Sequence, residues 1–190
     1  MLLKGKVGFA VGAILIVFLL ILELTGQNDM HKPEAPQTSN AYEVLRVIDG
    51  DTIEVNIDGE PVTVRMIGID CPESVHPDES LNTEYGEIAA DFTRTLLEGK
   101  NVLLEYDEQL TDEYGRTLAY VYIEGKENGG SVNAFLLQEG YARVMEIEPN
   151  TKYAELFRQR EHMASSGSSN AGKPKGFWNN YFIEEDNNES

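Results

Sequence analysis

A chain of 190 residues that is 41% apolar and 25% charged is long enough for one globular domain with its own core. Its formal net charge of −18 argues against tight, non-specific binding to duplex nucleic acid, because proteins that bind in this way are basic. Its single cysteine, Cys71, excludes an internal disulfide, so the stability of the fold must come from the core.

The first element that the sequence predicts is a membrane segment. Residues 7–22 are an unbroken run of apolar residues and glycines, preceded by Lys4 and Lys6. Such a run behind a basic start directs a chain to a membrane, as a cleaved signal or as an uncleaved anchor. No small-x-small cleavage site follows Leu22, so we favour an anchor over residues 1–26, with the domain outside the cytoplasm. The expected location is extracytoplasmic and membrane-anchored, or secreted if the segment is cleaved.

Two polar segments flank the expected domain of residues 41–180. Residues 27–40 contain two prolines and no periodicity, which is typical of a flexible tether, and residues 181–190 form an acidic tail. Domain and tail together hold 12 basic and 30 acidic residues, so they carry the whole negative excess. Acidic residues keep an exported domain soluble, while a bound cation neutralises the carboxylates of a metal site. We expect a monomer.

The first half of the domain predicts three strands in a meander. Residues 42–58 and 62–70 alternate apolar and polar residues, which is typical of strands with one buried face. Asp58-Gly59 is a hairpin turn signal, and Asp49-Gly50 marks a break or bulge between the first two strands.

A helix and two further strands follow in the prediction. Residues 84–98 place apolar side chains at helical intervals, and the pattern ends at Gly99. Residues 102–106 and 118–123 are short apolar runs separated by a polar loop, which is typical of a pair of strands.

The C-terminal part predicts two more helices. A short helix begins at a Ser131 cap and ends at Gly140. After an extended piece near residues 142–147, either Asn150 or Thr151 caps a third helix.

The order of these elements indicates the fold class. Three strands, a helix, two strands and two helices suit a mainly β fold with helices (α+β), a five-stranded OB-type barrel with three helices, preceded by the N-terminal membrane segment. Beyond a Ser/Gly/Lys loop at residues 165–176, we expect Phe177 and Trp178 to dock on the core.

Three short motifs together provide the groups that metal-assisted phosphodiester hydrolysis requires. Asp51 and Asp70 offer hard oxygen ligands for Ca²⁺ or Mg²⁺, and Glu73 offers a base for water. Arg65 and Arg116 offer planar cations that stabilise a phosphorane-like transition state. Few other chemistries need this combination.

Each motif alone also fits a purely structural role. Asp49-Gly50-Asp51 is typical of a turn, Arg65 of a surface ion pair on a strand, and Glu73 of a solvated acid. Cys71 has no adjacent histidine, which argues against thiol catalysis. The functional interpretation depends on the motifs occurring together.

Taken together, the motifs resemble those of the staphylococcal nuclease (thermonuclease) family. The resemblance runs from about Tyr42 to Trp178. It rests on Val47-Ile48-Asp49-Gly50-Asp51-Thr52, on residues 65–73, on Glu84-Tyr85-Gly86, on residues 112–116 and on Val132-Asn133 with Gly140. It implies an OB barrel that carries a Ca²⁺-dependent nuclease, which acts on DNA and RNA as substrates and leaves 3′-phosphates.

The resemblance also implies a role for each site residue. One Ca²⁺ ion takes the carboxylates of Asp51 and Asp70 and the main-chain carbonyl of Cys71, where the family usually has threonine. A backbone ligand tolerates that exchange, but the lost hydroxyl loosens the surroundings of the ligands.

Four further residues are implied to act on the substrate. Glu73 matches the proposed base for the attacking water, which it either deprotonates or orders. Arg65 and Arg116 match the two phosphate-binding arginines, whose paired hydrogen bonds a lysine does not reproduce. Tyr114 is retained as a substrate-binding residue.

Three acids depart from the family pattern. Glu113 stands where the family commonly has a lysine, and Glu146 and Glu148 stand at about the places of two tyrosines that flank the nucleotide base. These departures predict weaker nucleotide binding and a stronger need for Ca²⁺. The alternative interpretation is a catalytically inactive OB module that binds single-stranded nucleic acid or protein at the cell surface.

Overall fold

The computed structural model describes residues 40–74 and 82–166. The predicted anchor (1–26) and acidic tail (181–190) lie outside these residues, as do the tether up to residue 39 and the docking of Phe177 and Trp178. In the part of the chain that is described, no helix has the length and apolar character needed to cross a membrane.

Five strands form a closed barrel, which confirms the predicted OB-type architecture. In the order in which they are hydrogen-bonded, the strands are β1 (Tyr42–Asp49), β2 (Thr52–Ile57), β3 (Glu60–Met66), β6 (Thr117–Ile123) and β5 (Asn101–Glu105). The parallel pairing of β3 with β6 and the antiparallel pairing of β1 with β5 close the barrel. Closure leaves no unpaired sheet edge and encloses a core of aliphatic side chains such as Ile53, Val64 and Leu104.

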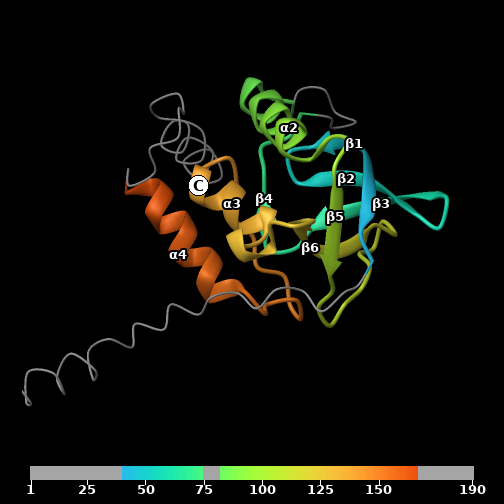
Figure 1. The fold of residues 1–190 in the computed structure, drawn as a ribbon. Coiled ribbons are helices and arrows are strands. Elements are labelled where there is room, and N and C mark those ends of the chain that lie inside the picture. The colour runs from blue at the N-terminus through green and yellow to red at the C-terminus, as the bar shows by residue number, and fades with distance from the viewer. Residues whose placement is uncertain (1–39, 75–81, 167–190) are drawn as a thin grey trace, which may run out of the picture. The chain divides into compact units, whose positions relative to one another are not determined.

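Local turn chemistry explains how the first three strands connect. The hairpin between β2 and β3 turns at Asp58 and Gly59, whose positive φ angles of 53° and 90° match the type I′ turn that the pair predicts. The β1–β2 ladder is shifted between Val47 and Asp49, which confirms the predicted irregularity at Asp49-Gly50. Figure 1 shows the β2–β3 hairpin projecting from the side of the barrel away from α4 (Ala154–Ser165).

The strand predicted over residues 62–70 is two strands in the structure. β3 ends at Met66, and β4 (Ile69–Asp70) pairs instead with β7 (Arg143–Val144) in a separate two-stranded sheet. The chain turns at Gly68, where φ is 77° and an added Cβ would lie 2.7 Å from the Phe157 ring. Only glycine suits that backbone conformation under a packed aromatic ring.

Three helices lie outside the barrel, as Figure 1 shows, together with a short 3-10 turn, η2 (Glu127–Gly129). Helix α2 (Glu84–Leu97) packs on β1 and is capped by the Thr83 side chain, which accepts a hydrogen bond from Gly86 N at 3.0 Å. Helix α3 (Val132–Glu139) packs on α4, and its predicted caps are both confirmed. Ser131 accepts from Ala134 N at 3.2 Å, and Gly140 is left-handed with a φ of 73°.

The predicted cap of the third helix is wrong. Helix α4 begins at Ala154 with Tyr153 at the cap position, and no side chain caps it. Asn150 is engaged elsewhere: its Oδ1 accepts from Gln109 N at 2.7 Å, and its Nδ2 donates to Gln109 O at 2.8 Å. A buried asparagine gains more from this paired contact than from a helix terminus, so the contact holds the loop after β5 against the segment before α4.

Candidate active site

The carboxylates of Asp51 and Asp70 meet at one guanidinium group. Arg65 extends from β3, and its Nη2 lies 3.0 Å from Asp51 Oδ2 and 3.1 Å from Asp70 Oδ1. Asp51 lies in the turn between β1 and β2, and Asp70 lies on β4, so three separate segments supply the cluster. The Arg65 side chain is only 14% exposed, and its Nη1 also donates to the carbonyl oxygen of Ile69 at 2.8 Å. The guanidinium is therefore held in one plane.

Asp51 is a buried acid whose charged form is disfavoured by its surroundings. Its Oδ2 accepts from Cys71 N at 2.8 Å, and its Oδ1 accepts from the Thr52 hydroxyl at 3.0 Å. Burial raises the pKa of Asp51 above its ordinary value, and the charges of Asp70 and Asp49 add to that effect, while Arg65 and Cys71 N oppose it. An added cation relieves such crowding of negative charge.

Cys71 contributes its backbone to this cluster, whereas its thiol is sequestered. The residue is 4% exposed, and burial raises the pKa of the thiol well above its ordinary value. A neutral, buried thiol is neither a nucleophile nor a metal ligand. A Cβ added to Gly50 would lie 2.7 Å from Cys71 Cβ, so glycine is required where β1 leads into the cluster.

Glu73 lies at the exposed edge of the cluster, next to Asp49. Partial desolvation of its carboxyl, a hydrogen bond with Asp49 and the charges of Asp49, Asp51 and Asp70 raise its pKa to about 7. Ser74 ties the same region together, because its hydroxyl donates to Asp49 Oδ1 at 2.7 Å. Sequence reasoning identified Asp49 only as a turn residue, although its place in the Asp-Gly-Asp motif was an available signal.

The first turn of α2 fixes the backbone of Glu73. Thr83 N donates to Glu73 O at 2.9 Å, and a Cβ added to Gly86 would lie 2.1 Å from the same oxygen. Only glycine at position 86 allows the first turn of α2 to pack this closely against the Glu73 backbone.

Arg143 is a cation of the site that sequence reasoning did not identify. It lies on β7 directly opposite Asp70 on β4, and its Nε is 3.3 Å from Asp70 Oδ2. Asp70 therefore contacts a guanidinium through each of its oxygens. A basic residue in an extended piece was visible in the sequence, but the pairing of β7 with β4 was not.

Arg116 is positioned by the tight turn that precedes it. Asp112 Oδ2 accepts from Arg116 Nε at 2.6 Å, and Asp112 Oδ1 accepts from the backbone N–H groups of Tyr114 and Arg116. Desolvation raises the pKa of Asp112, but the hydrogen bonds from Arg116 outweigh it and leave the pKa below its ordinary value. The Arg116 guanidinium lies 5.3 Å from the centroid of the Tyr114 ring, which is 76% exposed.

A cavity of about 510 Å³ lies between Arg65 and the turn that carries Tyr114 and Arg116. Arg65, Arg116 and Tyr114 all line it, while Asp51, Asp70 and Glu73 are not among the lining residues. The arginines, which come from strand β3 and from the loop before β6, thus face one space with the acid cluster next to Arg65. A phosphate in this cavity would meet two guanidinium groups.

The segment after β7 lines the cavity with apolar side chains and not with its two glutamates. Met145 and Ile147 line it, and neither Glu146 nor Glu148 does. Because side chains alternate along an extended chain, Glu146 projects to the other side, where its carboxylate forms an ion pair with Arg158 of α4. Neither glutamate therefore faces this cavity.

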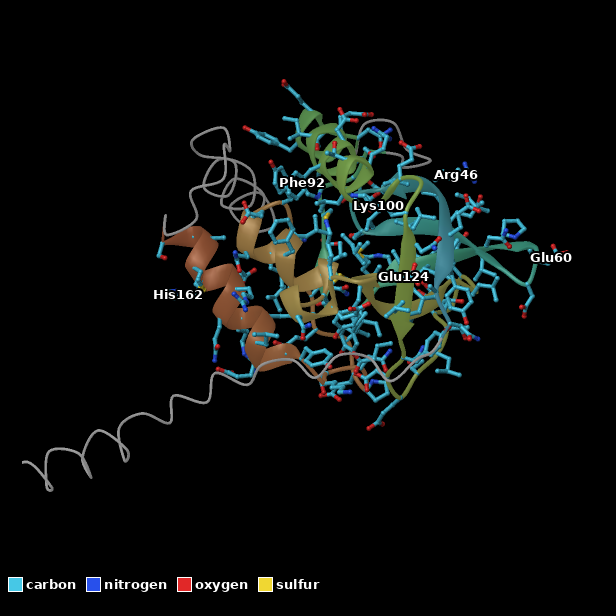
Figure 2. All side chains as sticks on the ribbon, in the orientation of Figure 1. Arg46, Glu60, Phe92, Lys100, Glu124 and His162 are labelled. Atoms are coloured by element: carbon cyan, nitrogen blue, oxygen red, sulfur yellow. The ribbon has the colours of Figure 1, made fainter. Side chains whose placement is uncertain are left out.

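No group of three His, Cys, Asp or Glu side chains within residues 40–74 and 82–166 is arranged to hold a metal. The predicted ligand set does not require one, since it consists of two carboxylates and a main-chain carbonyl. The histidine in this part of the chain, His162, lies on α4 (Figure 2).

The barrel, the paired carboxylates and the two arginines on one cavity fit an enzyme that cleaves phosphodiester bonds, and the comparisons with known proteins show that this class is a nuclease. The chain belongs to the staphylococcal nuclease family, because residues 63–180 match the model of the staphylococcal nuclease homologues.

Individual relatives agree with this assignment. The chain is 41% identical to the thermonuclease of Staphylococcus hyicus over 161 residues, which cover 83% of this chain and 92% of that protein. It is 40% identical to the thermonuclease of Staphylococcus intermedius over 167 residues, or 88% and 96% of the two chains. Endonuclease YncB of Bacillus subtilis is 42% identical over 156 residues, or 78% and 72%.

Proposed function

We propose that this nuclease is Ca²⁺-dependent, hydrolyses phosphodiester bonds of DNA and RNA, and leaves 3′-phosphates. The observation that carries the proposal is the single Arg65 nitrogen that contacts Asp51 and Asp70 beside a cavity lined by Arg116. The family resemblance supplies the expected metal, the substrate classes and the products.

The donor set of the cluster fits a hard divalent cation. Asp51 and Asp70 lie close enough to share one Arg65 nitrogen. Burial of the Asp51 carboxyl raises its pKa, and the negative charges of Asp70 and Asp49 add to that effect. Both carboxylates and the Cys71 carbonyl are oxygen donors, which Ca²⁺ prefers, and the Cys71 thiol is not needed as a ligand. When bound, the ion supplies a Lewis acid that polarises the phosphodiester.

The remaining site residues bind the phosphate and the water. Arg116 uses Nε for Asp112, and its two terminal nitrogens make no hydrogen bond with the described residues, so they are available to phosphate oxygens. Together with Arg65, these groups stabilise charge that develops on the phosphorus oxygens. Glu73, held by the first turn of α2, orders the attacking water and accepts its proton. Tyr114 offers an exposed ring to the nucleotide base.

We also propose the domain organisation that the sequence predicts. An anchor over residues 1–26 and a tether over residues 27–40 hold a monomeric nuclease domain of residues 41–180 outside the cytoplasm, followed by an acidic tail. Mass spectrometry of the native N-terminus tests the anchor. A chain that begins after residue 26 would show that the segment is cleaved and the enzyme secreted.

Hydrolysis of single-stranded DNA and of RNA by the full-length protein, with Ca²⁺, with Mg²⁺ and with chelator, tests the activity. We expect Ca²⁺-dependent cleavage that falls at least about 100-fold in Glu73→Gln and in Arg116→Ala. Glu60→Gln is the control, since Glu60 lies at the hairpin tip (Figure 2) and does not line the cavity. Folded wild-type protein that binds single strands without cleaving them would instead support an inactive binding module.

A further inference from the structure

The cavity beside the two arginines has no surplus of positive charge. Its charged lining residues are two cations and two anions: Arg65, Arg116, Asp112 and Glu113. Both cations already have carboxylate partners, Arg65 through Asp51 and Asp70, and Arg116 through Asp112. The lining therefore has no net positive charge with which to offset a second anionic group beside the phosphodiester that the two arginines would contact.

Glu113 is the acid of this lining that has no partner. It is exposed, and it makes no hydrogen bond or ion pair with any residue that the structure describes. It stands between Asp112, which holds Arg116, and Tyr114, whose ring contacts the Arg116 guanidinium. Its carboxylate therefore acts on whatever enters the cavity next to the phosphate at Arg116.

The other lining residues do not offset that acid. Leu118, Met145 and Ile147 are apolar. The amide side chains are engaged within the protein, because Asn150 bonds the Gln109 backbone through both amide atoms and Gln109 Nε2 donates to Thr111 O at 2.7 Å. None of these side chains carries a positive charge that would neutralise a second phosphate.

We propose that the enzyme selects internal phosphodiesters and discriminates against nucleic-acid ends that carry a phosphomonoester, with Glu113 as the residue that determines this specificity. The inference rests on the proposed nuclease function. A phosphomonoester carries about −1.5 to −2 charges at pH 7, whereas a diester carries one. The extra charge lies near Glu113, and the lining provides no cation beyond Arg65 and Arg116 to compensate it. The cavity therefore favours a continuing chain, or an end without phosphate.

Three dithymidine substrates with the same scissile bond test this inference: one with both ends free, one with a 5′-phosphate and one with a 3′-phosphate. In such short substrates, either end lies one nucleotide from the bond that is cleaved. We expect kcat/KM of the full-length enzyme with Ca²⁺ to be roughly threefold to tenfold lower for at least one phosphorylated substrate. The effect should shrink as salt rises, because Glu113 is exposed.

Variants of Glu113 identify the cause. Glu113→Gln should remove most of the difference in kcat/KM between the phosphorylated and the unphosphorylated dithymidine, and Glu113→Lys should reverse it. Glu60→Lys is the matched control because it alters the net charge equally at the tip of the β2–β3 hairpin (Figure 2), outside the cavity lining, and should keep the wild-type ratio.

The outcomes separate this inference from the nuclease proposal. Equal kcat/KM for all three substrates, or a ratio that Glu113→Gln leaves unchanged, would overturn the role of Glu113 while the nuclease proposal stands. Absence of cleavage of every substrate, including long single strands, would contradict the nuclease proposal itself.

Discussion

Two sites with buried carboxylates in this molecule have opposite surroundings. Around Arg65, the acids Asp49, Asp51, Asp70 and Glu73 lie near one another, and burial together with mutual repulsion raises the pKa of Asp51 and of Glu73. Around Glu105, a single buried carboxylate accepts hydrogen bonds from Tyr122 Oη at 2.8 Å and Tyr153 Oη at 2.9 Å, and Lys152 forms an ion pair with it.

The difference shows how the same residue type serves two purposes. The Glu105 network surrounds one charge with donors, so it stabilises the junction of β5, β6 and the start of α4. The Arg65 cluster holds more negative charge than its protein partners neutralise, which is unfavourable for folding and favourable for a cation and a phosphate. We expect substitutions in the first network to change stability and substitutions in the second to change activity.

The largest effect is expected for Arg65→Ala. It leaves the carboxylates of Asp51 and Asp70 buried without their shared cation, and it removes one phosphate-binding group. We expect nuclease activity to fall about 10³-fold and the free energy of unfolding to fall by about 3–5 kcal/mol. Single-turnover cleavage and urea unfolding measure the two effects. Arg46→Ala, which removes an exposed pair with Glu54 (Figure 2), should change neither appreciably.

Glu105→Ala should separate stability from activity. It leaves the hydroxyls of Tyr122 and Tyr153 without their acceptor in a buried region, so the free energy of unfolding should fall by about 2–4 kcal/mol. Activity per folded molecule should remain within about twofold, because Glu105 does not line the cavity. Glu105→Gln keeps an acceptor and should lose less stability. A large loss of activity in the folded Glu105→Gln enzyme would show that the two regions are coupled.

Asp51→Asn should raise the free energy of unfolding without Ca²⁺, whereas Glu105→Ala should lower it. Because the folded-state pKa of Asp51 is raised, the fold disfavours its charged form at neutral pH, and a neutral isostere should raise the free energy of unfolding in chelator. The same change should abolish most of the stabilisation that added Ca²⁺ gives to the wild type. Thermal unfolding with and without Ca²⁺ measures both quantities. A lower free energy of unfolding for Asp51→Asn in chelator would contradict the inference that the Asp51 charge is unfavourable for folding.

The smallest effect concerns two helix caps of the same kind. Thr83→Ala and Ser131→Ala each remove a side-chain cap, so each should lower the free energy of unfolding by about 1 kcal/mol. Only Thr83 also contacts the backbone of Glu73, so only Thr83→Ala should reduce kcat, by a few-fold. Equal kcat values for the two variants would show that the contact between Thr83 and the Glu73 backbone does not contribute to catalysis.

Features that depend on neighbouring residues were determined by the sequence itself. Asp58-Gly59 dictates a type I′ turn because its backbone preferences are local, and Ser131 and Gly140 bound α3 for the same reason. Alternation and helical spacing were sufficient to predict the five strands and three helices in order, because the barrel buries one face of each element. The residue types in the motifs were sufficient to suggest the reaction class.

Contacts between distant segments were decided only by the tertiary structure. The pairing of β7 with β4 sets Arg143 against Asp70, although 73 residues separate them, and no local preference encodes that contact. Asn150 has the side chain of a good helix cap, yet it bonds Gln109 because folding brings that backbone within reach. The direction of the segment after β7 likewise selects Met145 and Ile147 for the cavity and turns Glu146 toward Arg158. Local chemistry thus determined the elements and the residue types of the site, while packing between elements decided which side chains share one space.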